Sequence, residues 1–158
     1  MNEVRNKPEI TIVYADDEPT LHSLIGDMLK AILRNYNVQL KIVNNGGALL
    51  DELRTGRYAC AVTDHHMPEM TGFEALVQYR RENGVVPAVI ITGEGVSELT
   101  PRMNALENTV LLGKPFSVDE LRKALYTILP QTNPQYQKAE IGARYLFKHP
   151  PLPTTKAP

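Results

Sequence analysis

The chain is poor in cysteine and in large aromatic residues: among its 158 residues it has one cysteine, Cys60, and no tryptophan. A single cysteine excludes an internal disulfide and a metal cage built from several thiolates. Cys60 lies in the apolar run YACAV, where we expect a small buried side chain rather than a reactive thiol. An unpaired cysteine of this kind fits a reducing compartment.

The sequence also lacks a charge imbalance and a long apolar run. Its formal net charge is −1, which gives no bulk attraction for nucleic acid or for an anionic membrane. No apolar run approaches the ~20 residues that a membrane-spanning helix needs, and the first residues lack the apolar centre of a signal peptide. We therefore expect a cytoplasmic protein with no nucleic-acid or membrane partner, built as one domain with a tail.

What the chain does contain is an alternation of two kinds of segment. Short apolar runs rich in β-branched residues predict strands that are buried on both faces. These runs cover residues 10–15, 38–43, 58–63, 85–92 and 110–112. Segments with helical spacing or helix-start signals lie between them, over 19–33, 45–54, 72–84, a short one from 100, and 118–129. The alternation predicts an α/β domain with a five-stranded, doubly wound parallel sheet.

The last part of the chain has a different composition. We expect the domain over residues 8–130 and a tail over 131–158, in which prolines recur. The pattern allows one more helix over 134–148, with Asn133 as its cap, before a proline-rich end expected to be disordered. An apolar stripe on that helix, from Tyr136 to Phe147, would pack either on its own domain or on a partner.

Polar residues gather where the predicted strands end. Asp16 and Asp17 follow the first strand, Asp64 ends the third, Thr92 ends the fourth and Lys114 follows the fifth. The carboxyl ends of parallel strands share one edge of the sheet, so these side chains should converge there. Clustered carboxylates call for a cation, and hard oxygen ligands suit Mg²⁺. A metal and a lysine beside a nucleophilic carboxylate would hold a transferring phosphoryl group.

Four short motifs carry a family resemblance. They are DDEP after the first strand, D-x-x-M-P-x-M-x-G from Asp64, the lone Thr92, and the Lys114–Pro115 pair. In this order they resemble the receiver domains of two-component response regulators, over about residues 8–130. The resemblance implies a flavodoxin-like fold and a Mg²⁺-dependent phosphoacceptor that catalyses only its own phosphorylation and dephosphorylation. It implies a histidine kinase or a histidine phosphotransfer protein as phosphodonor, and a downstream protein effector.

The resemblance assigns roles to individual residues. Asp64 matches the phosphoacceptor, Asp17 the direct ligand of Mg²⁺, and Asp16 the acid that holds the ion through water. Asp64 also contributes to the metal site, and His66 matches the position whose backbone carbonyl is a ligand. A simpler reading of Asp16 and Asp17 is that they favour the positive end of the first helix.

Thr92 and Lys114 match the hydroxyl and the ammonium that contact the phosphoryl group. The family has a cis bond between this lysine and the following proline, and we expect the same at Lys114–Pro115. Gly93 would leave room beside the phosphoryl group. The chain departs from the family pattern at Leu111, where receivers usually have the aromatic residue that rotates inward when the threonine moves.

Three alternatives concern the site and the output. Asp16-Asp17-Glu18-Pro19-Thr20 loosely resembles the D-x-D-x-T loop of haloacid-dehalogenase-like phosphatases, which would make Asp16 the nucleophile. Adjacent His65 and His66 raise a zinc reading, but no third soft ligand lies nearby in sequence, so exposed loop histidines are expected. The residues after Pro130 are too few for a helix-turn-helix module, so we expect a stand-alone receiver that signals by protein–protein contact.

Overall fold

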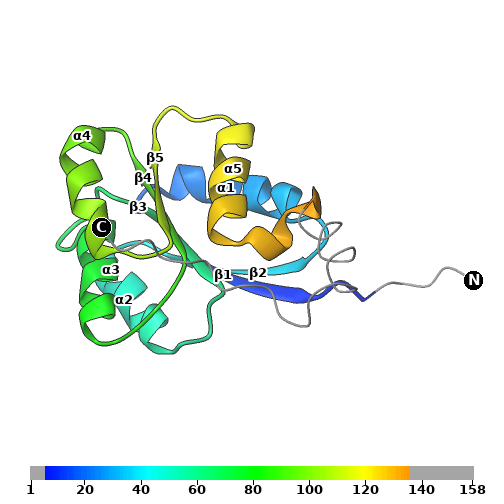
Figure 1. The fold of residues 1–158 in the computed structure, drawn as a ribbon, viewed down its shortest axis with the longest axis horizontal. Coiled ribbons are helices and arrows are strands. Elements are labelled where there is room, and N and C mark those ends of the chain that lie inside the picture. Colours follow the sequence, from blue (N-terminus) through cyan, green and yellow to red (C-terminus); the bar gives the residue numbers. More distant parts are fainter. Residues whose placement is uncertain (1–5, 136–158) are drawn as a thin grey trace, which may run out of the picture.

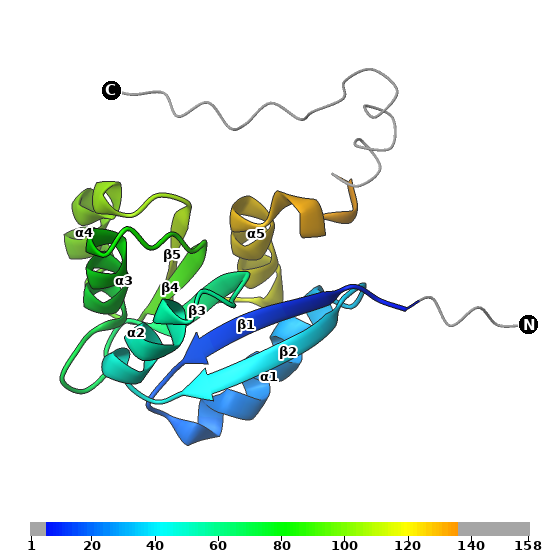
Figure 2. The same ribbon diagram turned by 90° about the horizontal axis from the view of Figure 1, so that it is seen from below.

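The computed structural model describes residues 6–135, and in them five parallel strands form one sheet in the order β2-β1-β3-β4-β5. The strands are β1 (Glu9–Ala15), β2 (Asn37–Val43), β3 (Cys60–Asp64), β4 (Ala88–Thr92) and β5 (Thr109–Gly113). This arrangement confirms the five-stranded, doubly wound sheet predicted from the alternation of segments. β1 and β2 lie side by side at one edge of the sheet (Figure 2). The helix predicted over 134–148 and the proline-rich end lie almost wholly outside the described residues.

Helices cover both faces of the sheet. They are α1 (Pro19–Ile32), α2 (Gly46–Arg54), α3 (Gly72–Arg81), α4 (Val96–Leu99) and α5 (Val118–Ile128), with 3-10 turns η1 (Thr100–Ala105) and η2 (Pro130–Thr132). α1 and α5 lie on one face, and α2, α3 and α4 lie on the other (Figure 1). Every residue of β3 and β4 is consequently buried, which explains why their sequences are nearly all apolar. Within residues 6–135 no helix is long and apolar enough to cross a bilayer.

The two faces of the sheet hold two separate apolar cores. Leu29 and Leu125 pack with Tyr14 on the face covered by α1 and α5. Leu49 and Ile90 belong to the core on the other face. Cys60 is fully buried in the first core, as expected, and burial raises the pKa of its thiol to about 12. The cysteine is therefore a packing residue.

The helix starts follow the signals in the sequence. The Ser117 hydroxyl accepts from the backbone N–H of Glu120, and the Glu120 carboxylate accepts from the N–H of Ser117, so the two residues form a capping box at the start of α5. Thr71 and Glu74 form the same reciprocal pair at the start of α3. The Asn45 side chain caps α2. These caps place the beginning of each helix just after the edge of the sheet where the polar residues gather.

Element boundaries differ most from the prediction at three places. β4 begins at Ala88 rather than at residue 85, because Pro87 has no N–H to donate to the sheet, and Val85 is exposed. α3 ends at Arg81, three residues before Gly84, because Asn83 takes a left-handed conformation with φ 63°. The helix after β4 begins at residue 96, and residues 100–105 continue it as a 3-10 turn.

Leu24 is an exposed apolar residue of α1. It falls on the apolar stripe of this helix, yet it is 56% exposed. It lines an open groove of about 440 Å³ between α1 and the segment after β5, together with Met28 and Phe116. Asp16 and Lys114 also line this groove, so its apolar walls reach the polar edge of the sheet.

Candidate functional site: an acidic cluster at the ends of β1 and β3

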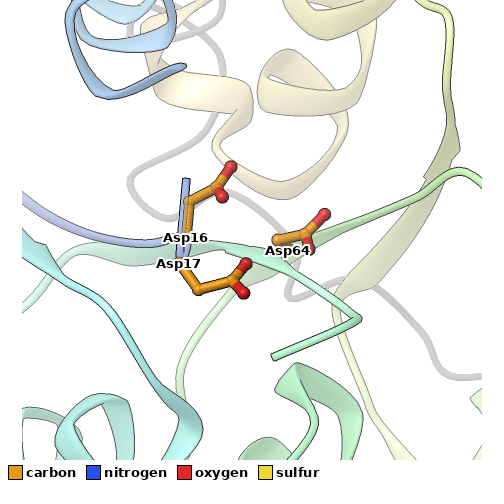
Figure 3. A group of neighbouring side chains, drawn as sticks. All are labelled: Asp16, Asp17 and Asp64. Atoms are coloured by element: carbon orange, nitrogen blue, oxygen red, sulfur yellow. The ribbon is translucent and has the colours of Figure 1, made fainter. Parts of the chain in front are cut away.

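Three aspartates meet at the carboxyl edge of the sheet. Asp16 and Asp17 directly follow β1, and Asp64 is the last residue of β3, the strand that pairs with β1. One carboxylate oxygen from each lies within 4.8 Å of the others, and the three side chains are neighbours in Figure 3. Asp16 is 3% exposed and Asp64 5%, whereas Asp17 is exposed. The cluster therefore has two buried members and one open side.

Asp16 is held at both ends of its carboxylate. The Tyr14 hydroxyl donates to Oδ2 over 2.6 Å, and the backbone N–H of Glu18 donates to Oδ1 over 2.9 Å. Its own backbone N–H donates to the carbonyl of Val43 at the end of β2, over 3.0 Å. These bonds fix the orientation of a charge that is almost fully removed from water.

Lys114 reaches the cluster from β5. Its Nζ lies 2.8 Å from Oδ1 of Asp64, and its backbone N–H donates to the carbonyl of Thr92 over 2.8 Å. The Lys114–Pro115 peptide bond is cis, as the resemblance implied. The chain thus places one ammonium on Asp64 rather than on Asp16 or Asp17.

Burial and charge shift the ionisation of this pair. Burial raises the pKa of Asp64 and is opposed by the hydrogen bond and charge of Lys114, while Asp16 and Asp17 add to the rise. Burial alone would lower the pKa of Lys114, but its hydrogen bond to Asp64 and the surrounding carboxylates raise it overall. The ammonium therefore stays charged. One positive charge faces three carboxylates, so the cluster keeps an excess of negative charge.

Thr92 lies at the same edge, but its hydroxyl points elsewhere in this structure. Thr92 is fully buried, and the hydroxyl donates to the backbone carbonyl of Glu94 in the loop after β4. Leu111, the residue in place of the family's aromatic, is half-buried and pairs with Ile90 of β4. A contact between the Thr92 hydroxyl and a group on Asp64 thus requires the hydroxyl to leave Glu94.

The loop after Asp64 is tightly packed against β3. The backbone N–H of Gly72 donates to the carbonyl of His65 over 3.0 Å, and a Cβ on Gly72 would overlap the carbonyl oxygen of Asp64 and the Thr63 hydroxyl. Gly72 is needed there because no side chain fits. This close approach is what brings the start of α3 against the phosphoacceptor candidate.

The two loop histidines are not alike. His66 is exposed, but His65 is half-buried, which corrects the expectation that both are exposed. Burial lowers the pKa of His65, and its buried Nδ1 has no hydrogen-bond partner among residues 6–135. The rings of the two histidines meet edge-on, with centroids 4.8 Å apart. Within the described residues, the cluster that could hold a metal contains aspartates only, so the zinc reading gains no support.

The donor set fits a hard divalent cation. Three carboxylates within reach of one point, one of them open to solvent, match the oxygen ligands and residual water that Mg²⁺ requires. Burial is the main cause that raises the pKa of Asp64, and the charges of Asp16 and Asp17 add to the rise; such an ion would neutralise these charges. Asp16, Asp17 and Asp64 are therefore the residues that would hold it.

One participant was missed by reasoning from the sequence. Tyr14 was placed only in the buried strand, but its hydroxyl reaches the metal-site candidate Asp16. The signal was present, since a tyrosine in a buried strand usually finds a partner for its hydroxyl. Its spacing of two residues puts it on the same side of β1 as Asp16.

Comparison with known proteins agrees with the fold and the site. The family model for the response regulator receiver domain matches residues 12–126. The transcriptional regulatory protein ZraR of Klebsiella oxytoca is 29% identical over 126 residues, covering 78% of this chain and 27% of that protein. FixJ of Bradyrhizobium diazoefficiens is 27% identical over 123 residues, covering 78% of this chain and 58% of that protein. The chain thus spans less than two thirds of the length of each of these relatives.

Solved structures show the same fold. The chemotaxis response regulator CheY4 of Vibrio cholerae superposes with a TM-score of 0.63 at 24% identity, covering 76% of this chain and 98% of that one. The receiver domain of the sensor histidine kinase PA1611 of Pseudomonas aeruginosa superposes with a TM-score of 0.63 at 22% identity, with 76% and 98% covered. That structure has a magnesium ion coordinated in its active-site cleft. Because the family model covers most of the chain and the fold agrees with it, this protein belongs to the response regulator receiver domain family of two-component signalling.

Proposed function

We propose that this chain acts in the cytoplasm as a receiver that accepts a phosphoryl group on Asp64 from a histidine kinase or a histidine phosphotransfer protein. The observation that supports this most is the pairing of Asp64 with Lys114, 2.8 Å apart, beside two further carboxylates. The output is a change in contact with a downstream protein. The domain boundaries of 8–130 stay a prediction.

The chemistry follows from a carboxylate nucleophile. An oxygen of Asp64 attacks the phosphorus of a phosphohistidine, the P–N bond breaks, and its electron pair returns to the imidazole nitrogen, which takes up a proton. The product is an acyl phosphate on Asp64. Dephosphorylation ends the signal: water attacks the phosphorus, the P–O bond to Asp64 breaks, and inorganic phosphate is released.

The other residues of the site neutralise the charge of the phosphoryl group and orient it. Mg²⁺, held by Asp16, Asp17, Asp64 and the backbone carbonyl of His66, would supply positive charge to the phosphoryl oxygens. The Lys114 ammonium already contacts Asp64 and would form an ion pair with a phosphoryl oxygen once Asp64 is phosphorylated. The Thr92 hydroxyl would leave the Glu94 carbonyl and donate to the phosphoryl group, which couples phosphorylation to the loop after β4.

The phosphatase reading of the first acidic loop is disfavoured by the same geometry. It needs Asp16 as the nucleophile, but both carboxylate oxygens of Asp16 accept hydrogen bonds from Tyr14 and Glu18. Lys114 contacts Asp64 instead.

A small phosphodonor tests the proposal without the partner. Purified protein incubated with acetyl phosphate and Mg²⁺ should gain one phosphoryl group, measured by intact mass. The site itself contains the nucleophile, the carboxylates that would hold the ion, and the Lys114 ammonium. Chelation of divalent ions with EDTA should abolish the gain, and Asp64→Asn should show none. Labelling that persists in EDTA, or in Asp64→Asn, would rule out the proposed site.

A further inference from the structure

Tyr14 is a buried polar residue to which the family resemblance assigns no role. It is fully buried in the core between the sheet and α1, yet its hydroxyl emerges beside Asp16 and donates to Oδ2 over 2.6 Å. In this contact the Tyr14 hydroxyl is the donor and the Asp16 carboxylate is the acceptor.

The hydrogen bond from Tyr14 fixes the orientation of the Asp16 carboxylate. Without it, the backbone N–H of Glu18 would be the one remaining donor to the carboxylate among the described residues, and a single donor leaves the carboxylate free to turn about its bond to Cβ. The backbone of Asp16 is fixed as well. His22 Nε2 lies 2.7 Å from its carbonyl oxygen, and the His22 ring meets the Tyr14 ring edge-on at 5.9 Å between centroids.

We propose that Tyr14 is a positioning residue for the magnesium site, holding the Asp16 carboxylate in the orientation that receives the ion's coordinated water. This proposal rests on the proposed function of Asp16 as a metal-site acid. Groups that hold metal-binding carboxylates and histidines in place commonly change metal affinity when they are removed, by about 10- to 100-fold. Because Asp16 would act through water, we expect the lower end of that range.

Because Tyr14 and Lys114 contact different carboxylates, Mg²⁺ affinity and the rate of phosphoryl transfer to Asp64 should respond differently to loss of the Tyr14 hydroxyl. Tyr14 contacts Asp16, whereas the nucleophile Asp64 is paired with Lys114. Loss of the Tyr14 hydroxyl should therefore weaken Mg²⁺ binding, because Asp16 must be reoriented when the ion enters. It should leave the labelling rate at saturating Mg²⁺ close to that of the wild type.

The test compares Tyr14→Phe with a matched control. Tyr58→Phe removes another tyrosine hydroxyl that donates to a carboxylate over the same 2.6 Å, that of Glu52, away from the acidic cluster. By calorimetric titration with MgCl₂, Tyr14→Phe should raise the Mg²⁺ dissociation constant about tenfold, and Tyr58→Phe should leave it unchanged. Acetyl phosphate labelling of Tyr14→Phe at saturating Mg²⁺ should stay within about twofold of wild type, by analogy with loss of uniform binding.

Two results would overturn the proposal: an unchanged or lower Mg²⁺ dissociation constant in Tyr14→Phe, or a labelling defect that saturating Mg²⁺ does not restore. In an Asp16→Asn background, Tyr14→Phe should have no further effect on Mg²⁺ affinity, and a tenfold further loss would show that Tyr14 acts by another route. If wild-type protein neither binds Mg²⁺ nor becomes labelled, the proposed function fails first; if it does both and Tyr14→Phe matches it, only this inference fails.

A second measurement does not depend on the folding of the variant. The chain has no tryptophan, so its near-ultraviolet absorption comes mainly from its seven tyrosines. Mg²⁺ added to the wild-type protein should change the tyrosine difference spectrum with the same midpoint as the calorimetric titration, because the partner of the Tyr14 hydroxyl becomes part of the metal site. Tyr58→Phe should retain this signal. A wild-type protein that shows no change in the tyrosine difference spectrum at saturating Mg²⁺ would contradict the proposal.

Discussion

Asp17→Asn should lower Mg²⁺ affinity by about a hundredfold and reduce labelling by acetyl phosphate to background at millimolar Mg²⁺. Two unit charges about 4 Å apart attract by roughly 1 kcal/mol in water and roughly 4 kcal/mol near a protein surface. A divalent ion doubles that attraction, and about 1.4 kcal/mol corresponds to a factor of ten in affinity. Asp17 is the exposed member of the cluster, so its replacement by the isosteric amide should leave the fold intact.

The control for this variant is an acid on the helix that follows Asp17, away from the cluster. Asp27 is exposed on α1, and Asp27→Asn makes the same change in net charge. Calorimetric titration with MgCl₂ and intact-mass labelling of both variants measure the effect. An Asp17→Asn protein that binds Mg²⁺ and becomes labelled like the Asp27→Asn protein would show that the ion does not sit in this cluster.

Lys114→Ala should slow phosphorylation of Asp64 by about a hundredfold, while Mg²⁺ binding survives. Removing one preorganised donor from a group that carries developing charge typically costs a factor of roughly 10² to 10³. Lys114 is the ammonium in contact with Asp64, and the charge it neutralises there increases once a phosphoryl group is added. The rate of labelling by acetyl phosphate at saturating Mg²⁺ is the measurement.

Lys41→Ala is the matched control for Lys114→Ala. Lys41 forms an ion pair of its own, 3.8 Å from Glu52, and its side chain is 54% exposed. This variant should label at the wild-type rate. Lys114→Arg should recover part of the lost rate, because it keeps the charge but not the compact shape of the ammonium. If Lys114→Ala labels as fast as Lys41→Ala, Lys114 has no part in the transfer.

The order of elements and the convergence of the site could be predicted from the sequence because both follow from local patterns. Strands buried on both faces must be apolar throughout, as in the run before Asp64, and such strands are easy to recognise. A parallel sheet then brings the residues after each strand to one edge, whatever the details of packing. Asp16, Asp17, Asp64 and Lys114 were predicted together for this reason, and the structure places them together.

What could not be predicted depends on contacts between distant residues. The Thr92 hydroxyl donates to a carbonyl two residues ahead, an orientation that the position of Thr92 at a strand end does not determine. His65 is half-buried because the loop after β3 folds back onto the sheet at Gly72, where no Cβ fits. The exposed fraction of Leu24 depends on the groove beside Phe116, which forms only when the segment after β5 packs near α1.

The most direct test of the central claim is to map the phosphoryl group on wild-type protein. The protein is labelled with acetyl phosphate and Mg²⁺, digested under conditions that preserve acyl phosphates, and analysed by peptide mass spectrometry. We predict that the phosphoryl group lies on Asp64 and on no other residue. Label on Asp16 would favour the phosphatase reading, label on His65 or His66 would indicate a different phosphoacceptor, and either result would contradict the account of this site.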